Sequence, residues 1–312
     1  MQRSFWRSRF KRLNTGGEDV EPTRSPMIHQ PRTLNELSLL FQRIEKPLLW
    51  AGGTYLMSKS EYYPSPSNRQ IIDLAEIEEL KRINRTDRYI DIGSMVNASS
   101  LLSAGKLILP SILKSALGSI IGHITRRQIT IGGSVCEPES RVAFSTALSV
   151  LDAQAEIRQW EEGRFTATWI PVNRLYDKDG SLLLRNTAFV LTKIRLGLEW
   201  GDFQRFVLID NPIRKPDTAI LVAFQATRNQ TALTKVRFSA SFPKKAFYIS
   251  PELENQLSLL SFPVHPDRVN SISYEMVHDL TNRHESITEF QAERTRRVFE
   301  SFLHELNIQT LS

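Results

Sequence analysis

The sequence predicts an α+β fold, and three observations carry this prediction. The chain has 312 residues, 41% of them hydrophobic and 24% charged, which is enough for about two globular domains. Up to about Gly201, short strand-like runs return around short helical segments. Beyond it, a set of strand-like runs precedes helical segments that close the chain.

The first ordered elements lead into a pair of glycines. Thr33 and Glu36 form a capping box, in which each side chain satisfies the other residue's backbone donor, before a helix expected from Leu34 to Glu45. Pro47 ends this helix. The apolar run 48–51 then predicts a short buried strand that breaks at Gly52-Gly53.

The next elements lead into a second pair of glycines. We expect strands at 70–74 and 89–92, separated by a short helical turn at 77–81. Asn97 caps a helix through Leu102, and Pro110 opens another over 111–117. Gln128 to Ile131 is interpreted as a strand that enters Gly132-Gly133.

After the second glycine pair, the pattern predicts a helix at 142–151 and strands at 155–160, 165–170 and 189–196. An antiparallel set is expected at 203–209, 220–225, 236–242 and 246–249. Two helices should then close the chain. The last of these helices, around 286–306, should place one apolar face across a sheet, made of Phe290, Val298, Phe299, Phe302, Leu303 and Leu306.

Composition excludes several classes of protein. A single cysteine, Cys136, allows no internal disulfide and no iron-sulfur cluster built by this chain alone. Half of the net charge of +6 lies in residues 1–26, which we interpret as a flexible basic tail. There is no basic stripe with aromatic platforms for a nucleic acid and no apolar run long enough to span a membrane, so we expect neither partner and a cytoplasmic location.

The two glycine pairs are the strongest candidates for a binding site. A strand that ends in two glycines leaves backbone N–H groups uncovered by any Cβ, so an anion can approach them. Thr54 adds a hydroxyl to the first turn, and Thr130 and Ser134 flank the second. Each turn alone is most often only a tight turn. Together, two such turns can hold the two phosphates of one dinucleotide. Neither matches a Rossmann or P-loop motif.

The remaining polar residues have ordinary interpretations. The six histidines show no metal-like spacing. Cys136 lies near the second turn but is most simply a small buried residue, and Asp73 and Asp91 are expected to face solvent or satisfy a turn. Trp50 is expected to pack in the core, Tyr55 to lie at an edge, and Arg126-Arg127 to be solvated. No catalytic triad or usable pair of carboxylates is found.

A run of short motifs resembles a known family. In order they are PLLWAGGTYL, IIDLAEIEELKRI, YIDIGSMV, LPSILKSAL, TRRQITIGGSV and ALSVLDAQAEI. Their order and spacing resemble the FAD-binding subunit of the xanthine dehydrogenase and carbon monoxide dehydrogenase family of molybdenum hydroxylases. The region from Phe203 to Leu306 resembles the family's small C-terminal domain.

The resemblance implies a domain organisation and a set of FAD-contacting residues. A PCMH-type, two-part FAD-binding domain would span 27–201, and a small α+β C-terminal domain would span 202–312. Arg205 would stand where the family often has a basic residue. The residues implied to lie on or near FAD are Leu49, Trp50, Ala51, Gly52, Gly53, Thr54, Tyr55, Leu56, Leu109, Pro110, Thr130, Ile131, Gly132, Gly133 and Ser134.

The resemblance also implies a function and partners. Electrons would pass from iron-sulfur clusters on one partner subunit, through FAD, to NAD or another acceptor, while a molybdopterin subunit oxidises the substrate. Two positions depart from the family: Ser134 replaces a usual Asn, and Ala143 replaces a usual Asp that contacts the cofactor. The missing carboxylate removes an anchor on the order of 1 kcal/mol. The alternative is therefore a scaffold protein that keeps the fold and has lost FAD.

Overall fold

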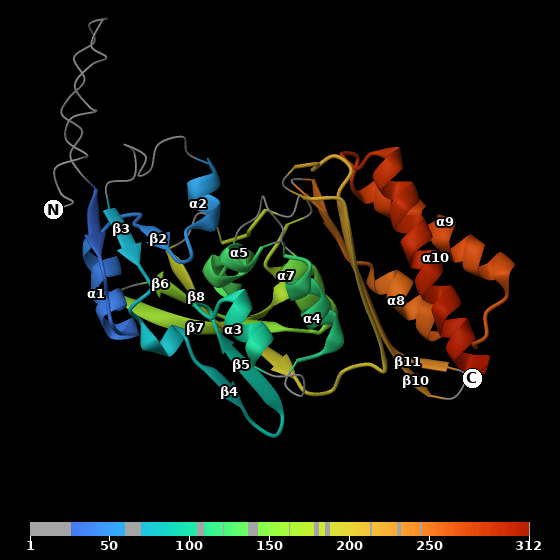
Figure 1. The fold of residues 1–312 in the computed structure, drawn as a ribbon, viewed down its shortest axis with the longest axis horizontal. Helices are drawn as coiled ribbons and strands as arrows, with labels where there is room; N and C mark the ends of the chain where they lie inside the picture. Colours follow the sequence, from blue (N-terminus) through green and yellow to red (C-terminus); the bar gives the residue numbers. More distant parts are fainter. Residues whose placement is uncertain are drawn as a thin grey trace, which may run out of the picture.

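Three β-sheets follow one another along the molecule (Figure 1). The structure is a computed structural model that describes residues 26–59, 70–104, 109–120, 122–136, 143–161, 163–177, 181–184, 188–212, 214–229, 232–243 and 245–311. Helices and strands alternate through the first two sheets, and three helices close the chain, so the predicted α+β class is confirmed. The expected tail falls on residues 1–26, of which only Pro26 is described.

The first sheet is small and parallel. Its strands are β1 (Met27–His29), β2 (Leu48–Trp50) and β3 (Gln70–Asp73), in the order β1-β3-β2. Helix α1 (Leu34–Arg43) packs Leu37 and Phe41 against Ile72 and Leu74. Thr33 caps α1, because its Oγ1 accepts from the Glu36 N–H at 3.1 Å. The prediction of a reciprocal contact, as in a capping box, is wrong. The Glu36 carboxylate accepts from the N–H of Arg32 and not from that of Thr33.

The second sheet has five strands and is antiparallel throughout. The strands are β4 (Ile83–Arg85), β5 (Tyr89–Gly93), β6 (Gln154–Glu161), β7 (Arg164–Pro171) and β8 (Phe189–Gly197), in the order β4-β5-β8-β6-β7. Strand β8 thus lies between β5 and β6, although about 100 residues separate it from β5 in the sequence. The predictions for β5 to β8 are confirmed.

Short helices cover the inner face of this sheet. They are α3 (Ala98–Ser103), α4 (Ser111–Gly118), α5 (His123–Gln128), α6 (Ile131–Cys136) and α7 (Ala143–Val150), while α2 (Thr54–Lys59), η1 (Glu78–Leu80) and η2 (Val172–Arg174) join other elements. Asn97 caps α3 through Ser100, as predicted. Alternate residues of the strands, among them Ile90, Ile157 and Ile194, pack with these helices in one core.

The outer face of the same sheet carries paired charges. Asp91 is only 8% exposed, and its carboxylate accepts two hydrogen bonds from Arg195, at 2.7 and 2.9 Å. The guanidinium also lies over the rings of Tyr89 and Trp169. The prediction that Asp91 faces solvent or satisfies a turn is therefore wrong, because a cross-strand arginine covers it. Asp73 does satisfy a turn, since it accepts from the N–H of Ala75.

The third sheet forms the C-terminal part with three helices. Its strands are β9 (Phe203–Ile209), β10 (Ile220–Asn229), β11 (Ala232–Phe242) and β12 (Ala246–Tyr248), in the order β12-β11-β10-β9. The helices are α8 (Pro251–Ser258), α9 (Pro266–Arg283) and α10 (Glu289–Leu311). Two closing helices were predicted, and α8 is the additional one. Phe290 does not lie on the buried face of α10, because its side chain is 48% exposed.

Strand β10 is buried on both faces and joins the two halves of the chain. Leu221 and Ala223 pack in the core shared with α4 and α7, whereas Val222 and Phe224 pack in the core shared with α8, α9 and α10. Because successive side chains of a strand point to opposite faces, this double burial explains the continuous apolar run in β10.

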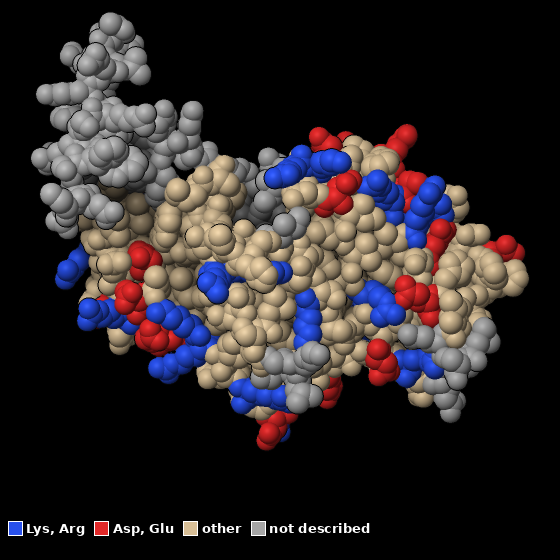
Figure 2. All heavy atoms as spheres, in the orientation of Figure 1, with Lys and Arg blue, Asp and Glu red and all other residues tan. Residues whose placement is uncertain are grey.

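Charges of both signs are interspersed on the face shown in Figure 2. Among the described residues, charged side chains also form ion pairs, for example Arg283 with Asp279 and Glu252, and Arg297 with Glu293. In the part of the chain that the structure describes, no helix is both long enough and apolar enough to span a membrane.

Candidate functional site

The first glycine pair lies between strand β2 and helix α2. Gly53 has a φ of +69°, which favours glycine, and a Cβ there would lie 2.3 Å from Cζ2 of Trp50. Trp50 is half-buried and packs beneath this turn. Among the described residues, the N–H groups of Gly52, Gly53 and Thr54 donate to no protein acceptor. The first turn of a helix leaves such donors unpaired, so they are available to an anionic group.

The second glycine pair has a different conformation from the one predicted. Gln128 ends α5, Thr130 forms only an isolated bridge with Asn97, and both glycines lie within α6. The strand predicted at 128–131 is therefore wrong.

Neighbouring backbone already uses the donors of this second turn. The N–H of Gly132 donates to the carbonyl of Ser94 at 2.8 Å, and those of Gly133 and Ser134 donate to the side chain and carbonyl of Thr130. The prediction that this turn offers several free donors is wrong for these three N–H groups, because Gly132 donates to the segment after β5 and the other two donate to Thr130 of the same turn.

The two turns nevertheless lie against each other, as the dinucleotide hypothesis requires. A Cβ on Gly52 would lie 1.8 Å from the carbonyl oxygen of Gln128, and a Cβ on Gly133 would lie 3.9 Å from Cβ of Ala51. A Cβ on Gly132 would lie 2.6 Å from Cβ of Ser94. The glycines thus allow the backbones of two distant segments to approach closely.

A cavity of about 790 Å³ opens beside this contact, between the first and second sheets. It is in the size range of small-molecule and cofactor sites. Ala51, which precedes the first glycine pair, and Gly132 and Gly133 of the second form part of its wall, so segments of both turns meet at one cavity. The rest of the wall is mostly apolar and is made of Phe41, Lys46, Pro47, Leu49, Leu74, Ser94, Met95, Cys136, Ala188, Phe189, Val190 and Leu191.

The polar groups of the wall fit a largely apolar ligand with a polar centre. Oγ of Ser94 is buried and has no hydrogen-bond partner within the described residues, and the same holds for Oγ of Ser134 close by in α6. A buried hydroxyl without a partner is unusual in a protein, and a bound group can supply the missing hydrogen bond. A flat ring system with a diphosphate, such as FAD, matches the apolar walls and the free donors of the first turn.

Of the predicted site residues, the structure brings Leu49, Ala51, Gly132 and Gly133 to the cavity wall. The wall does not include Trp50, Gly52, Gly53, Thr130 or Ser134. Thr54, Tyr55 and Leu56 lie on α2 and are half-buried, while Ile131 and Leu109 are buried in the core of the second sheet. Pro110 is the N-cap of α4. The side chain of Ala143 lies outside the described residues.

Arg205 lies away from the cavity and pairs with Glu305 of α10 at 2.6 Å. The sequence interpretation missed Phe41, Leu74, Met95 and 188–191, because apolar residues of this kind give no local signal that distinguishes a cavity wall from a core.

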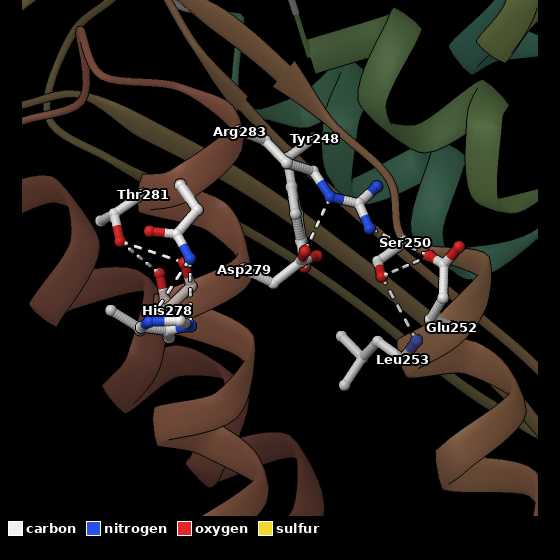
Figure 3. Close-up of polar contacts among 10 residues, drawn as sticks. Tyr248, Ser250, Glu252, Leu253, His278, Asp279, Thr281 and Arg283 are labelled. Carbon is white, nitrogen blue, oxygen red and sulfur yellow. Dashed lines mark hydrogen bonds and ion pairs between the residues drawn. The ribbon is translucent and has the colours of Figure 1, made fainter.

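A second polar cluster is structural. The hydroxyl of Tyr248 donates to Asp279 at 2.8 Å, and Arg283 joins Asp279 to Glu252 (Figure 3). Burial and the neighbouring Asp279 carboxylate raise the pKa of Tyr248. None of these residues lines the cavity beside the glycine turns. The cluster therefore holds β12, α8 and α9 together. Among the described residues, no group of His, Cys, Asp and Glu is arranged to hold a metal ion.

Comparisons with known proteins agree with the geometry. The sequence profile of the family described as FAD binding domain in molybdopterin dehydrogenase matches residues 21–196, more than half of the chain. A search of curated protein sequences finds no significant relative.

Solved structures with the same fold include a carbon monoxide dehydrogenase from Hydrogenophaga pseudoflava that lacks the Mo-pyranopterin moiety of the molybdenum cofactor. It is 17% identical with a TM-score of 0.72, and the alignment covers 89% of this chain and 94% of that one. The reconstituted carbon monoxide dehydrogenase from Oligotropha carboxidovorans is 17% identical with a TM-score of 0.69, covering 90% and 96%.

Quinoline 2-oxidoreductase from Pseudomonas putida 86 is 13% identical with a TM-score of 0.70, covering 92% and 97%. At these identities the likeness shows the fold. The family itself is shown by the profile match over more than half of the chain. The chain belongs to the family of FAD-binding domains of molybdopterin dehydrogenases.

Proposed function

We propose that the protein is the flavin-holding subunit of a molybdenum hydroxylase-like oxidoreductase. The observation that carries this proposal is the close contact between the segments that hold the two glycine pairs, with Ala51, Gly132 and Gly133 on the wall of one apolar cavity. FAD bound there supplies electron transfer between iron-sulfur clusters of a partner and an acceptor such as NAD. The chain itself needs no acid or base for this role.

The residues around the cavity have separate tasks in this proposal. The free N–H groups of Gly52, Gly53 and Thr54 lie next to the wall residue Ala51 and not on the wall itself, and they would bind the diphosphate where it extends beyond the cavity. Ser94 would donate a hydrogen bond from its buried hydroxyl. The apolar side chains of α1, β2 and β8 would exclude water from the flavin, which strengthens the remaining electrostatic contacts. The other sequence-predicted site residues belong to the same proposal.

The proposed assembly includes an iron-sulfur subunit and a molybdopterin subunit. It is supported by the family and by the molybdenum cofactor named for the similar carbon monoxide dehydrogenase. We include in the proposal a division into an FAD domain at 27–201 and a C-terminal domain at 202–312. A cytoplasmic location is also part of it, with the single cysteine as support.

The scaffold alternative is not favoured by the family match, but Ser134 and Ala143 give it a specific test. The full chain is purified, and its visible spectrum is recorded before and after FAD is added and the excess removed. A flavin spectrum at one equivalent per chain supports the proposal. A colourless protein that does not take up FAD refutes it.

A variant tests the alignment behind the alternative. Ala143→Asp should tighten FAD binding by about tenfold, because a carboxylate that accepts a hydrogen bond contributes on the order of 1 kcal/mol or more. Quenching of FAD fluorescence measures the dissociation constant. Ala143→Asn is the matched control for size, and equal affinity of Ala143→Asp and the unchanged protein contradicts the assigned position.

A further inference from the structure

A second cavity lies between the two halves of the chain, away from the glycine turns. Its volume is about 290 Å³. One wall comes from the end of α7, the residues just after it and η2, and the other from β11, from Ile249 after β12 and from α8. Ten residues line it: Ser149, Asp152, Asn173, Arg237, Phe238, Ser239, Ile249, Pro251, Glu254 and Asn255.

Buried polar atoms of this wall lack partners. Ser239 is fully buried, and its Oγ has no hydrogen-bond partner within the described residues. Oδ1 of Asn173 on the opposite wall is likewise buried without a partner. A buried polar atom left unpaired costs about 1–3 kcal/mol, so two of them on one cavity indicate a ligand or water that completes their hydrogen bonds.

The charges around the cavity cancel. Asp152 pairs with Lys235 at 2.9 Å and with Arg237 at 2.8 Å. Glu254 accepts from Arg237 at 3.3 Å and from the N–H of Phe238 at 3.0 Å. The two carboxylates are thus paired with two cations, Lys235 and Arg237. A small anion or cation bound here would find no unpaired charge of opposite sign. The site therefore favours a neutral ligand.

The unused hydrogen-bonding groups are of both kinds. Arg237 uses Nε and Nη1 in the contacts that it makes, which leaves Nη2 as a donor, and the hydroxyl of Ser239 is a second donor. Oδ1 of Asn173 is an acceptor. The hydroxyl of Ser149 donates to the carbonyl of Ser145, so its oxygen keeps an acceptor site. A primary carboxamide carries a carbonyl acceptor and N–H donors on adjacent atoms and complements both kinds.

We propose that this cavity is a binding site for a small neutral carboxamide, held between Ser239 and Arg237 on one side and Asn173 on the other. A ligand there contacts residues of both halves of the chain and strengthens their association. The site is separate from the FAD cavity, so the inference does not depend on flavin binding.

Acetamide is the probe, and saturation-transfer NMR of its methyl signal on the full chain is the measurement. We expect saturable binding that weakens about three- to tenfold in Ser239→Ala and in Asn173→Ala, the range for loss of one neutral hydrogen bond. Ser271→Ala, an exposed serine of α9, is the matched control and should bind acetamide like the unchanged protein.

Three results would overturn the proposal. The first is absence of saturable transfer from acetamide, which means that water alone fills the cavity. The second is equal binding in Ser239→Ala, Asn173→Ala and Ser271→Ala, which places acetamide elsewhere. The third is binding of acetate or glycerol with the same dependence on Ser239, which makes the ligand an anion or a polyol. Circular dichroism checks that each variant is folded. If only one of the two cavity variants folds, its comparison with Ser271→Ala decides the second result.

Discussion

Replacement of Gly52 by alanine tests the central feature of the site, the contact between the two turns. The added Cβ would lie 1.8 Å from the carbonyl oxygen of Gln128 and 2.8 Å from its carbonyl carbon. Ordinary contact begins at 3.4 Å, so the oxygen and the Cβ must separate by 3.4 − 1.8 = 1.6 Å. Both atoms belong to backbone, which cannot rotate away as the end of a side chain can.

The size of the effect follows from this geometry. Overpacking in a closely packed interior costs about 1–3 kcal/mol, and a backbone clash of this size belongs at the upper end. We therefore expect Gly52→Ala to lower the free energy of unfolding by about 3 kcal/mol. The corresponding fall in Tm is about 6–12 °C for a domain of 150–250 residues. FAD affinity should fall about tenfold or more, because the two parts of the cavity wall separate.

Gly118→Ala in α4 is the matched control. A Cβ at Gly118 meets no atom within 4 Å, and alanine favours a helix over glycine by up to about 1 kcal/mol. Thermal unfolding followed by circular dichroism, and titration of FAD fluorescence, measure both variants. If Gly52→Ala unfolds within a degree or two of Gly118→Ala and binds FAD equally well, the two turns are not in the contact described.

Three further predictions concern the surroundings of the site. Asp91→Ala should lower the free energy of unfolding by about 1–3 kcal/mol, less than for a fully buried ion pair because Arg195 is partly exposed. A double-mutant cycle with Arg195→Ala should show a coupling energy above about 0.5 kcal/mol, and additive effects of the two substitutions would contradict the ion pair. Tyr248→Phe should cost about 1–2 kcal/mol in urea unfolding, because Asp279 loses a buried donor, and an unchanged midpoint would count against this contact. Two arginines of α10 lower the pKa of Glu293 to about 2 from its ordinary value of 4.5. The ion pairs of Glu293 with these arginines therefore stabilise the fold above about pH 4.5, and this contribution is lost as the pH falls toward 2. The contribution is small because Glu293 is exposed. Glu293→Gln should flatten the Tm profile in this window, and parallel profiles would exclude the effect.

Elements with a strong local signal were predictable. Thr33, Asn97 and Pro110 mark the starts of α1, α3 and α4, and each helix begins where its cap predicts. Strand β10 was predicted from its apolar run, which the burial of both its faces explains.

The second glycine turn could not be predicted, because tertiary contacts decide its conformation. Ile129, Thr130 and Ile131 are β-branched and favour a strand. In the fold, however, the N–H of Ile131 donates to the carbonyl of Val96 and that of Gly132 to the carbonyl of Ser94, and α6 starts at this point. Strands β1 and β4 were not predicted, because each has three residues and neither belongs to a longer apolar run such as the one at 48–51 that marks β2.

The part of the site that the sequence predicted correctly consists of Leu49, Ala51, Gly132 and Gly133. The pairs at 52–53 and 132–133 follow from the need of two backbones to approach closely. Phe41, Met95 and Phe189 look like ordinary core residues in the sequence, and only the packing of distant segments makes them a cavity wall. The free donors likewise depend on which N–H groups the rest of the chain has already used.

The residues of the cavity wall are spread over the sequence from Phe41 to Leu191. The last of them in the sequence belong to β8, the strand that lies between β5 and β6 in the sheet. During synthesis the ribosome delivers residues in order, so the wall stays incomplete until β8 has left the exit tunnel. Closing such long segments is slow compared with forming local helices. The cavity can therefore enclose a cofactor only after residue 191 has been synthesised, and a chain truncated before β8 would lack Phe189, Val190 and Leu191 from the wall.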